Sequence, residues 1–338
     1  MIPEKALFIQ LKMLGDIMML TPAIKAFKNK FPGARLDIAV EPPGEELVRL
    51  NPHVDNTIVF DHRHWFSVFK QYKAIRKLRE QNYDLAIDFL GNPRSAHYTF
   101  LSGAKTRIGY SDAQFQYAYS KTFNRTHCYS ALSKLKFLEF LEIETSDYMP
   151  ELVIDPKTVL PGELTDLSRK NLIAISPVSI RDHKVWPTEN FVELVEYLYS
   201  DFNLYSVVIA GPGERGFLDT FSNLVSIPFR PMYIDNIMLL GAVLKRCGLF
   251  IGNDNGPKHI ALALGLPTYT VYSNSSDPVC WDYPDKLRYR FIGGMNRPDE
   301  LPIKKISIAE VKTQIAEFIN DLGLIENEKM TSDKRTDS

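Results

Sequence analysis

Residues 6–31 read ALFIQLKMLGDIMMLTPAIKAFKNKF, and this stretch decides the fold class. Its first part, from Ala6 to Lys12, is a short and mostly apolar run of the kind that forms a buried strand. Apolar residues then recur at steps of three and four, which places them on one face of a helix. These residues are Ile17, Leu20, Ile24, Phe27 and Phe31. A strand followed directly by a helix is the repeating unit of a parallel sheet.

The same alternation of short apolar runs and helical periodicity continues along the chain and predicts a parallel α/β fold. Further strands are expected at 35–40, 56–60 and 84–90, and again at 171–176, 205–211, 248–252 and 268–272. Helices are expected at 66–81, 131–141, 256–264 and 306–322, and at 188–198 with Thr188 as the N-cap.

The alternation is interrupted once, which predicts two domains. Between Glu144 and Lys170 the periodicity is lost and Pro, Asp, Thr and Glu accumulate, as in a linker. The 338 residues also exceed the roughly 250–300 at which a single core stops growing. We therefore expect an N-terminal domain at 1–155, a C-terminal domain at 170–325 and a disordered polar tail at 326–338.

Composition narrows the class of protein. A formal net charge of -1 gives no attraction to polyanions, so nucleic acid is not an expected partner. The start has no secretory pattern, and no window reaches the roughly 18 apolar residues of a membrane span, so we expect a cytoplasmic protein. Three widely separated cysteines favour reduced thiols over disulfides or a zinc site.

One candidate for chemistry lies in the first half. Asp16 follows the first strand, at the end where open α/β sheets bind their ligands. A carboxylate there could take a proton from an attacking hydroxyl, and Gly15 would permit the tight turn that presents it. The alternative is that Asp16 only caps the helix.

Two candidates lie in the second half. The loop after its first strand, residues 176–187, contains Ser179 and Lys184, and hydroxyl and ammonium groups suit a phosphate. Residues 252–259 read GNDNGPKH before a helix that starts near Gly256, where backbone amides and His259 could bind an anion. The alternatives are a solvated loop anchored by Trp186 and an Asn-rich turn without a ligand.

A third segment supports a different class of function. Residues 211–216 read GPGERG, formally a G-x-G-x-x-G between a strand and a helix, and Asp235 lies where a ribose-binding acid is expected. This motif favours a nicotinamide-dependent oxidoreductase as the alternative. Pro212, which stiffens the turn, and the position in the middle of the chain weaken it.

Taken in order, these segments resemble glycosyltransferase family 9, the ADP-heptose:lipopolysaccharide heptosyltransferases, from Leu7 to about Leu322. The matching segments are Leu14-Gly15-Asp16 with Thr21-Pro22-Ala23-Ile24, Asp88 to Ser95, Gly103-Ala104-Lys105, Arg107 to Tyr110, Lys184 to Pro187, and Gly252 to His259. The resemblance implies the GT-B architecture, two Rossmann-like domains with parallel sheets facing across a cleft. It also implies an inverting transfer of heptose from ADP-heptose to the inner core of lipopolysaccharide or lipooligosaccharide, without a metal or cofactor.

The resemblance also implies a role for each site residue. Asp16 would be the general base and Lys184 would stabilise the departing diphosphate. The donor-binding residues would be Ser179, Glu214, Asp254, Asn255, Gly256 and His259. The acceptor-binding residues would be Lys12, Arg94, Lys105 and Arg107, for which ordinary surface cations are the alternative. The partners would be a nucleotide-sugar donor and a lipid-linked glycan, with peripheral contact at the inner membrane.

The chain departs from the family's commonest pattern at two places. Asn255 stands where Ser or Thr is usual, and Ser273 to Pro278 replaces a Gly-Pro-Thr-like run. Another nucleotide sugar or another surface glycan therefore stays open as donor or acceptor. A sugar-binding protein without turnover is disfavoured, because both Asp16 and Lys184 are present.

Overall fold

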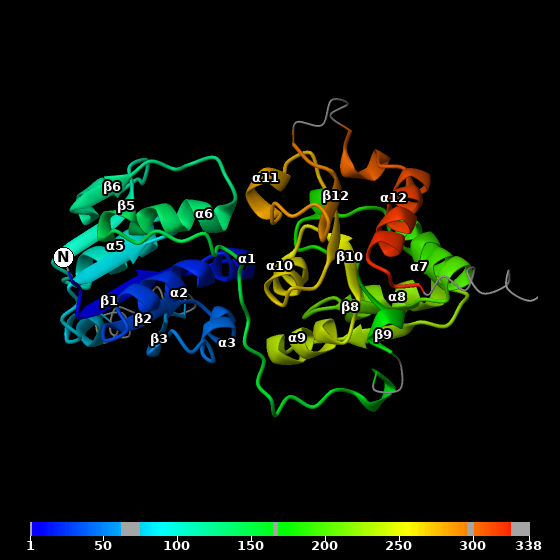
Figure 1. Cartoon of the computed structure of the whole chain (residues 1–338), viewed down its shortest axis with the longest axis horizontal. Coiled ribbons are helices and arrows are strands. Elements are labelled where there is room, and N and C mark those ends of the chain that lie inside the picture. Colours follow the sequence, from blue (N-terminus) through cyan, green and yellow to red (C-terminus); the bar gives the residue numbers. More distant parts are fainter. Residues whose placement is uncertain (1, 62–74, 165–167, 296–300, 326–338) are drawn as a thin grey trace, which may run out of the picture. The chain divides into compact units, whose positions relative to one another are not determined.

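A computed structural model describes residues 2–61, 75–164, 168–295 and 301–325, which form two compact units. Unit 1 consists of Met1–Thr158 with the short segments Leu262–Gly265 and Val279–Pro284, and unit 2 of Val159–Ala261, Leu266–Pro278 and Asp285–Ser338. Figure 1 shows the helices and strands of each unit. The expected tail at 326–338 lies outside the described residues, as does most of the expected helix at 66–81, whose described part is helical at 75–79.

Unit 1 contains a six-stranded parallel sheet in the order β3-β2-β1-β4-β5-β6. The strands are β1 (Lys5–Ile9), β2 (Arg35–Val40), β3 (Asn56–Val59), β4 (Leu85–Asp88), β5 (Thr106–Tyr110) and β6 (Lys121–Phe123). The helices are α1 (Leu14–Met18), α2 (Thr21–Lys30), α3 (Gly44–Val48), α5 (Pro93–Leu101) and α6 (Ser130–Leu135), with 3-10 turns η2 (Gln116–Ala118) and η3 (Lys136–Leu141).

Unit 2 repeats this arrangement in the order β12-β11-β10-β7-β8-β9. The strands are β7 (Leu172–Ser176), β8 (Tyr205–Ala210), β9 (Arg230–Tyr233), β10 (Leu249–Asn253), β11 (Thr268–Tyr272) and β12 (Tyr289–Gly293). The main helices are α7 (Thr188–Phe202), α8 (Arg215–Leu224), α9 (Ile237–Lys245), α10 (Gly256–Ala263) and α12 (Ile308–Asp321). The turn η6 (Asp182–Lys184) precedes α7, and the short helix α11 (Pro278–Trp281) follows β11.

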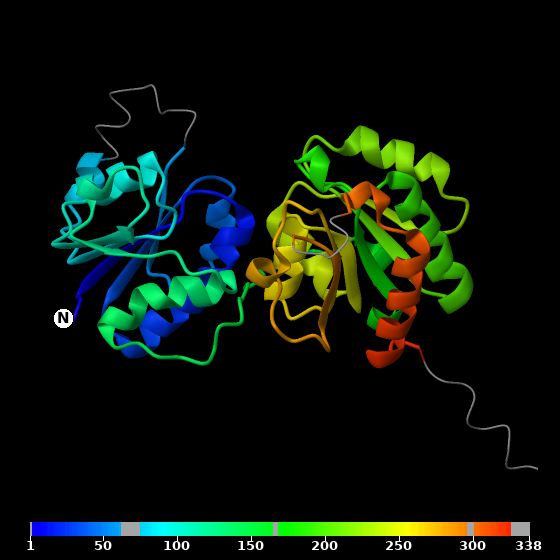
Figure 2. The same cartoon turned by 90° about the horizontal axis from the view of Figure 1, so that it is seen from above.

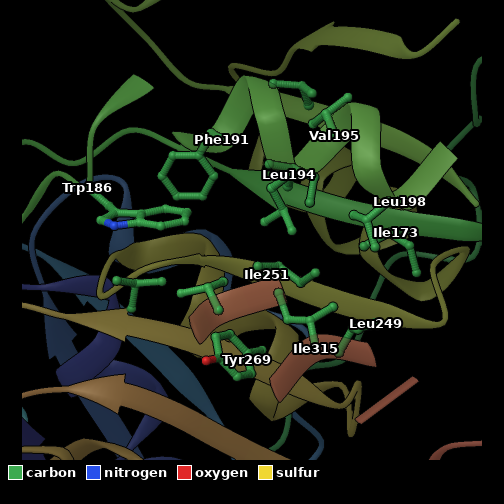
Figure 3. Close-up of a cluster of buried hydrophobic side chains, with 14 of the residues drawn as sticks. Ile173, Trp186, Phe191, Leu194, Val195, Leu198, Leu249, Ile251, Tyr269 and Ile315 are labelled. Atoms are coloured by element: carbon green, nitrogen blue, oxygen red, sulfur yellow. The ribbon is translucent and has the colours of Figure 1, made fainter. Parts of the chain in front are cut away.

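The unit 2 sheet is covered by helices on both faces. Helices α7 and α12 pack side by side on one face, and α9 and α10 lie on the other (Figures 1 and 2). The α7 face is anchored by Trp186, which is fully buried and packs edge-on against Phe191 at 5.1 Å between ring centroids (Figure 3). The indole N–H donates to the carbonyl of Ile306 at 2.9 Å. Trp186 therefore fixes the end of the loop that carries Lys184.

Both sheets have the strand order of a doubly wound Rossmann fold, which confirms the predicted fold class. In each sheet the direction of winding reverses at one place, between β1 and β4 in unit 1 and between β7 and β10 in unit 2. Loops at the carboxyl ends of those strands diverge and leave a crevice where such folds bind ligands. This geometry selects the loops after β1, β4, β7 and β10.

The sequence-based boundaries were wrong in some details. The single helix expected from Ile17 to Phe31 is two helices, because Thr21 and Pro22 begin α2 after α1 has ended. Thr188 is the first residue of α7 and makes no side-chain cap, since Pro187 occupies the N-cap position. No helix in the described ranges is both long and apolar enough to cross a bilayer.

Helix α9 offers a test of this local structure. The Asn236 side chain accepts a hydrogen bond from the Leu239 amide at 2.9 Å and caps the helix. Asn236→Ala should lower the free energy of unfolding by about 1 kcal/mol, measured by urea denaturation. Asn223→Ala, at an exposed position of α8, should leave the free energy of unfolding unchanged or raise it slightly. Equal effects of the two changes would contradict the cap.

Candidate active site

In unit 1 the turn after β1 brings Asp16 to the crevice edge of the sheet. Asp16 is on the short helix α1, with a side chain 25% exposed. The residue before α1, Met13, has a φ of 65°, a conformation that costs a non-glycine residue roughly 1–3 kcal/mol. Strain of this kind persists only where the surroundings enforce it, so the turn is held in place by its neighbours.

One of those neighbours, Lys134, was not anticipated from the sequence. Its ammonium lies 3.6 Å from the Asp16 carboxylate and donates to the Gln10 side chain at 3.1 Å. Lys134 is 3% exposed, and this burial lowers its pKa, while the Asp16 carboxylate acts in the opposite direction. The candidate base is therefore paired with a buried cation from α6.

Arg94 and Lys12 lie on the same edge of the unit 1 sheet as Asp16. Arg94 is on α5, which follows β4, and pairs with Glu41 at 2.7 Å. Glu41 follows β2 and is 5% exposed. Lys12 follows β1 and is exposed. Glu41 was missed because a lone acid after a strand carries no distinguishing pattern.

The structure does not bring Lys105 and Arg107 to this edge. Lys105 immediately precedes β5, so it lies at the amino end of the strands, where it pairs with Asp84 at 3.0 Å. Arg107 donates to the carbonyls of Ala118 and Ala104, both at 2.8 Å. Both cations already have partners at the opposite edge from Asp16, so we leave them out of the site proposed below.

In unit 2 Lys184 and Asp254 form a close ion pair across the crevice edge. Lys184 ends the turn η6 after β7, Asp254 follows β10, and the Lys184 ammonium lies 2.5 Å from the carboxylate. Burial opposes the charge of Asp254, but His259 and the positive charges of Lys258 and Lys184 outweigh burial and hold the pKa of Asp254 well below its usual range. Asp254 therefore stays charged.

Two further groups converge on the Asp254 carboxylate. The His259 ring nitrogen Nε2 lies 3.6 Å from one carboxylate oxygen. Ser276 donates to the other oxygen at 3.0 Å. Ser276 belongs to the segment that departs from the family's commonest pattern, so that departure contacts the site directly. This contact could not be inferred from positions 22 residues apart in the sequence.

Asn255 holds the start of α10 and the loop after β7 together. Its side-chain oxygen accepts from the Lys258 amide at 3.1 Å, which caps α10. Its side-chain nitrogen donates to the Ser176 hydroxyl and the Val178 carbonyl, both at 2.8 Å. The side chain is thus occupied by the protein, while Gly256 opens the helix. Backbone amides at a helix start suit an anion.

The other residues expected on the donor side, Glu214 and Ser179, make hydrogen bonds within their own loops. Glu214 accepts from the Gly211 amide at 2.7 Å, so its carboxylate is folded back onto its own loop. Ser179 is partly exposed, and its hydroxyl accepts from the Arg181 amide at 3.4 Å. A Cβ at Gly252 would lie 2.7 Å from the Ser176 carbonyl, so this glycine serves the packing of β10 against β7 and not the approach of a ligand.

The strand order also bears on the oxidoreductase alternative. The dinucleotide fingerprint belongs to the first strand–helix turn of a Rossmann fold, which in unit 2 is the turn between β7 and α7. Residues 211–216 follow β8, the next strand. The glycine motif therefore follows the second strand of unit 2 and not the first, and the nicotinamide interpretation loses its structural basis.

Comparison with known proteins gives a consistent result. Residues 71–297, more than half of the chain, match the family model described as glycosyltransferase family 9 (heptosyltransferase). A Haemophilus influenzae protein provisionally named a glycosyltransferase is 24% identical to this chain. The match covers 96% of this chain and 99% of the length of that protein. Lipopolysaccharide heptosyltransferase 3 of Escherichia coli is 24% identical, over 79% of this chain and 81% of its own.

A solved structure agrees in fold. Escherichia coli heptosyltransferase WaaC with ADP-2-deoxy-2-fluoro heptose superimposes with a TM-score of 0.75 at 20% identity, covering 93% of this chain and 99% of that one. At this identity the likeness establishes the shared fold.

Proposed function

Because this chain belongs to glycosyltransferase family 9, we propose that it transfers heptose from ADP-heptose to the inner core of lipopolysaccharide or lipooligosaccharide. Glycosyl transfer is common to the family. The identities of the donor and of the acceptor are what we propose. Relatives named as lipopolysaccharide heptosyltransferases support them. The observation that carries the proposal is the convergence of Lys184, Asp254 and the start of α10 at the crevice edge of the unit 2 sheet, which we call the Lys184 site.

We assign the donor to the Lys184 site on charge and geometry. The diphosphate of ADP-heptose is anionic and would bind Lys184 and the Gly256 amide at the start of α10, where Pro257 has no N–H and Asn255 occupies the Lys258 amide. Asp254, already charged and fixed by Ser276, would accept hydrogen bonds from sugar hydroxyls. His259 would complete the Lys184 site, Ser179 would add a hydroxyl, and Glu214 would bind the ribose after leaving the Gly211 amide.

The transfer itself is proposed to be a single displacement. An acceptor hydroxyl oxygen attacks the anomeric carbon while its proton passes to the Asp16 carboxylate. The bond between the anomeric carbon and the β-phosphate oxygen breaks, and ADP leaves with the electron pair. Lys184 stabilises the charge that develops on the leaving group, the kind of fixed electrostatic contribution that often dominates such catalysis. Attack opposite the leaving group inverts the anomeric configuration.

The acceptor is assigned to the crevice edge of unit 1. Lys12 is exposed there, and Arg94 is held by Glu41 so that its orientation is fixed. Both cations suit the carboxylate or phosphate groups of an inner-core glycan. Since that acceptor is lipid-linked, we further propose that the protein works in the cytoplasm, in peripheral contact with the inner membrane.

Mass spectrometry of the acceptor tests the substrates. A purified core acceptor lacking heptose is incubated with ADP-heptose, and in parallel with UDP- and GDP-sugars. We expect the mass to rise by one heptose with ADP-heptose only. Transfer from a UDP- or GDP-sugar, with none from ADP-heptose, would keep the family and overturn the proposed donor.

We expect the reaction to need no metal, because we assign the stabilisation of the diphosphate charge to Lys184 and the Gly256 amide. Prior treatment with EDTA should leave the initial rate unchanged. A loss of rate that added Mg²⁺ or Mn²⁺ restores would show that a metal, and not these groups alone, carries that role.

A further inference from the structure

Lys134 belongs to no predicted motif, yet it is one of the few buried cations in the described structure. It lies on α6, 118 positions along the chain from Asp16, and is 3% exposed. A buried ammonium without a nearby anion is strongly unfavourable, so its position requires a compensating partner. The Asp16 carboxylate, at 3.6 Å, is that partner.

Lys134 also contacts Gln10, at the start of the turn that leads from β1 to Asp16. It donates to the Gln10 side-chain oxygen at 3.1 Å, and the Gln10 side-chain nitrogen donates to the Lys12 carbonyl at 3.1 Å. Gln10 is fully buried. Lys134 thus connects both ends of the segment that contains Met13, whose backbone is strained. Two attachments to one turn fix its conformation better than either alone.

We propose that Lys134 is a positioning residue for the general base: its ammonium pairs with the Asp16 carboxylate and holds it oriented for proton transfer. This inference rests on the function proposed above, in which Asp16 is the base. An ammonium within about 4–6 Å favours the charged form of a carboxylate, and a fixed partner restricts its rotation. Lys134 would act through Asp16 and would not contact the substrate.

Asp88 and Tyr110 are two further titratable groups that interact with this pair. Asp88 on β4 is fully buried; burial raises its pKa, and its hydrogen bonds to Gly91, Tyr119 and Leu90 act in the opposite direction. Burial raises the pKa of Tyr110 on β5 to about 12, so this phenol stays neutral.

Arg125, which follows β6, is a further charged group that acts on Lys134. It disfavours the charged form of Lys134, but its guanidinium pairs with Asp112 at 2.9 Å. The cation closest to Asp16 among the described ion pairs is therefore Lys134.

The test compares Lys134→Met and Lys134→Gln with Lys134→Arg and with Lys136→Met, an exposed lysine two positions away. The pH dependence of kcat is measured with the donor that the wild-type enzyme uses. Lys134→Met should shift the acid limb to higher pH by about one unit or more and lower kcat at least about tenfold. Lys134→Gln, which can still donate to Gln10, should show the same shift. Lys134→Arg should restore most of the rate, and Lys136→Met should match the wild type.

A second measurement does not depend on turnover. The Asp16 side-chain carboxyl is followed by 13C NMR across pH, its signal assigned by its loss in Asp16→Asn. Removing the Lys134 charge should move its titration to higher pH. An unchanged titration and pH profile in both Lys134→Met and Lys134→Gln would overturn the inference. If no donor supports turnover in the wild type, the proposed function fails while this titration still decides the role of Lys134.

Discussion

Asp16→Asn should reduce transfer about 10³-fold while leaving the affinity for ADP within about twofold of the wild type. The amide has nearly the same shape as the carboxylate but cannot accept the proton of the acceptor hydroxyl. Asp16 belongs to unit 1, whereas the residues assigned to ADP belong to unit 2. Transfer should therefore be lost while ADP affinity is kept. Initial rates measure transfer, and isothermal titration measures the affinity for ADP.

A matched control for this change is available in the same unit. Asp147 is half-exposed and pairs with Lys25 at 2.7 Å. Asp147→Asn removes a carboxylate and a surface ion pair, which contributes little to stability, and should leave transfer unchanged. If Asp16→Asn retained wild-type turnover with the same donor and acceptor, Asp16 would have no part in the mechanism.

Lys184→Ala should weaken both steps. The Kd for ADP should rise by about 10- to 100-fold, since a hydrogen bond to a charged group contributes roughly 1.5–3 kcal/mol. The value of kcat/KM should fall by about 10²–10³, because the leaving diphosphate loses its stabilising cation. Removing Lys184 also leaves the Asp254 carboxylate, 5% exposed on its side chain, facing the phosphates without its nearest counter-charge.

Two further variants separate these contributions. Lys170→Ala removes an exposed lysine just before β7, at the other end of the strand from Lys184, and should leave ADP binding unchanged. The double variant Lys184→Ala/Asp254→Asn removes the uncompensated anion and should regain part of the ADP affinity lost in Lys184→Ala. Equal ADP affinity in Lys184→Ala and the wild type would remove the diphosphate from the Lys184 site.

The buried strands were predictable because most of their side chains are apolar. β1, β2, β7, β10 and β11 are almost fully buried and appear in the sequence as short apolar runs. The edge strands β6, β9 and β12 were missed, since they mix exposed and half-buried residues and have no continuous pattern. A strand at an edge is defined by its pairing partner, which local periodicity does not encode.

The site residues divide in a similar way. Asp16, Lys184 and Asp254 lie between the strands β1, β7 and β10 and the helices that follow them or in the first of those helices, so the strand order brought them to the crevice edges. Lys105 was assigned to the acceptor from the family resemblance. β5 had not been predicted, and a residue just before a strand lies at its amino end.

Contacts between distant segments were the part that the sequence could not provide. Lys134 reaches Asp16 from α6, and Ser276 reaches Asp254 from the segment after β11. Neither residue lies in a motif, and both contacts depend on how separate elements pack. One signal was present for Ser276: it lies in the segment where the chain departs from its family.

The anomeric configuration of the product is the most direct test of a single displacement that uses the Asp16 carboxylate and the Lys184 site. NMR of the glycan formed from ADP-heptose of known configuration gives the configuration of the new bond. The mechanism predicts complete inversion at the anomeric carbon. A product that keeps the donor's configuration would contradict it.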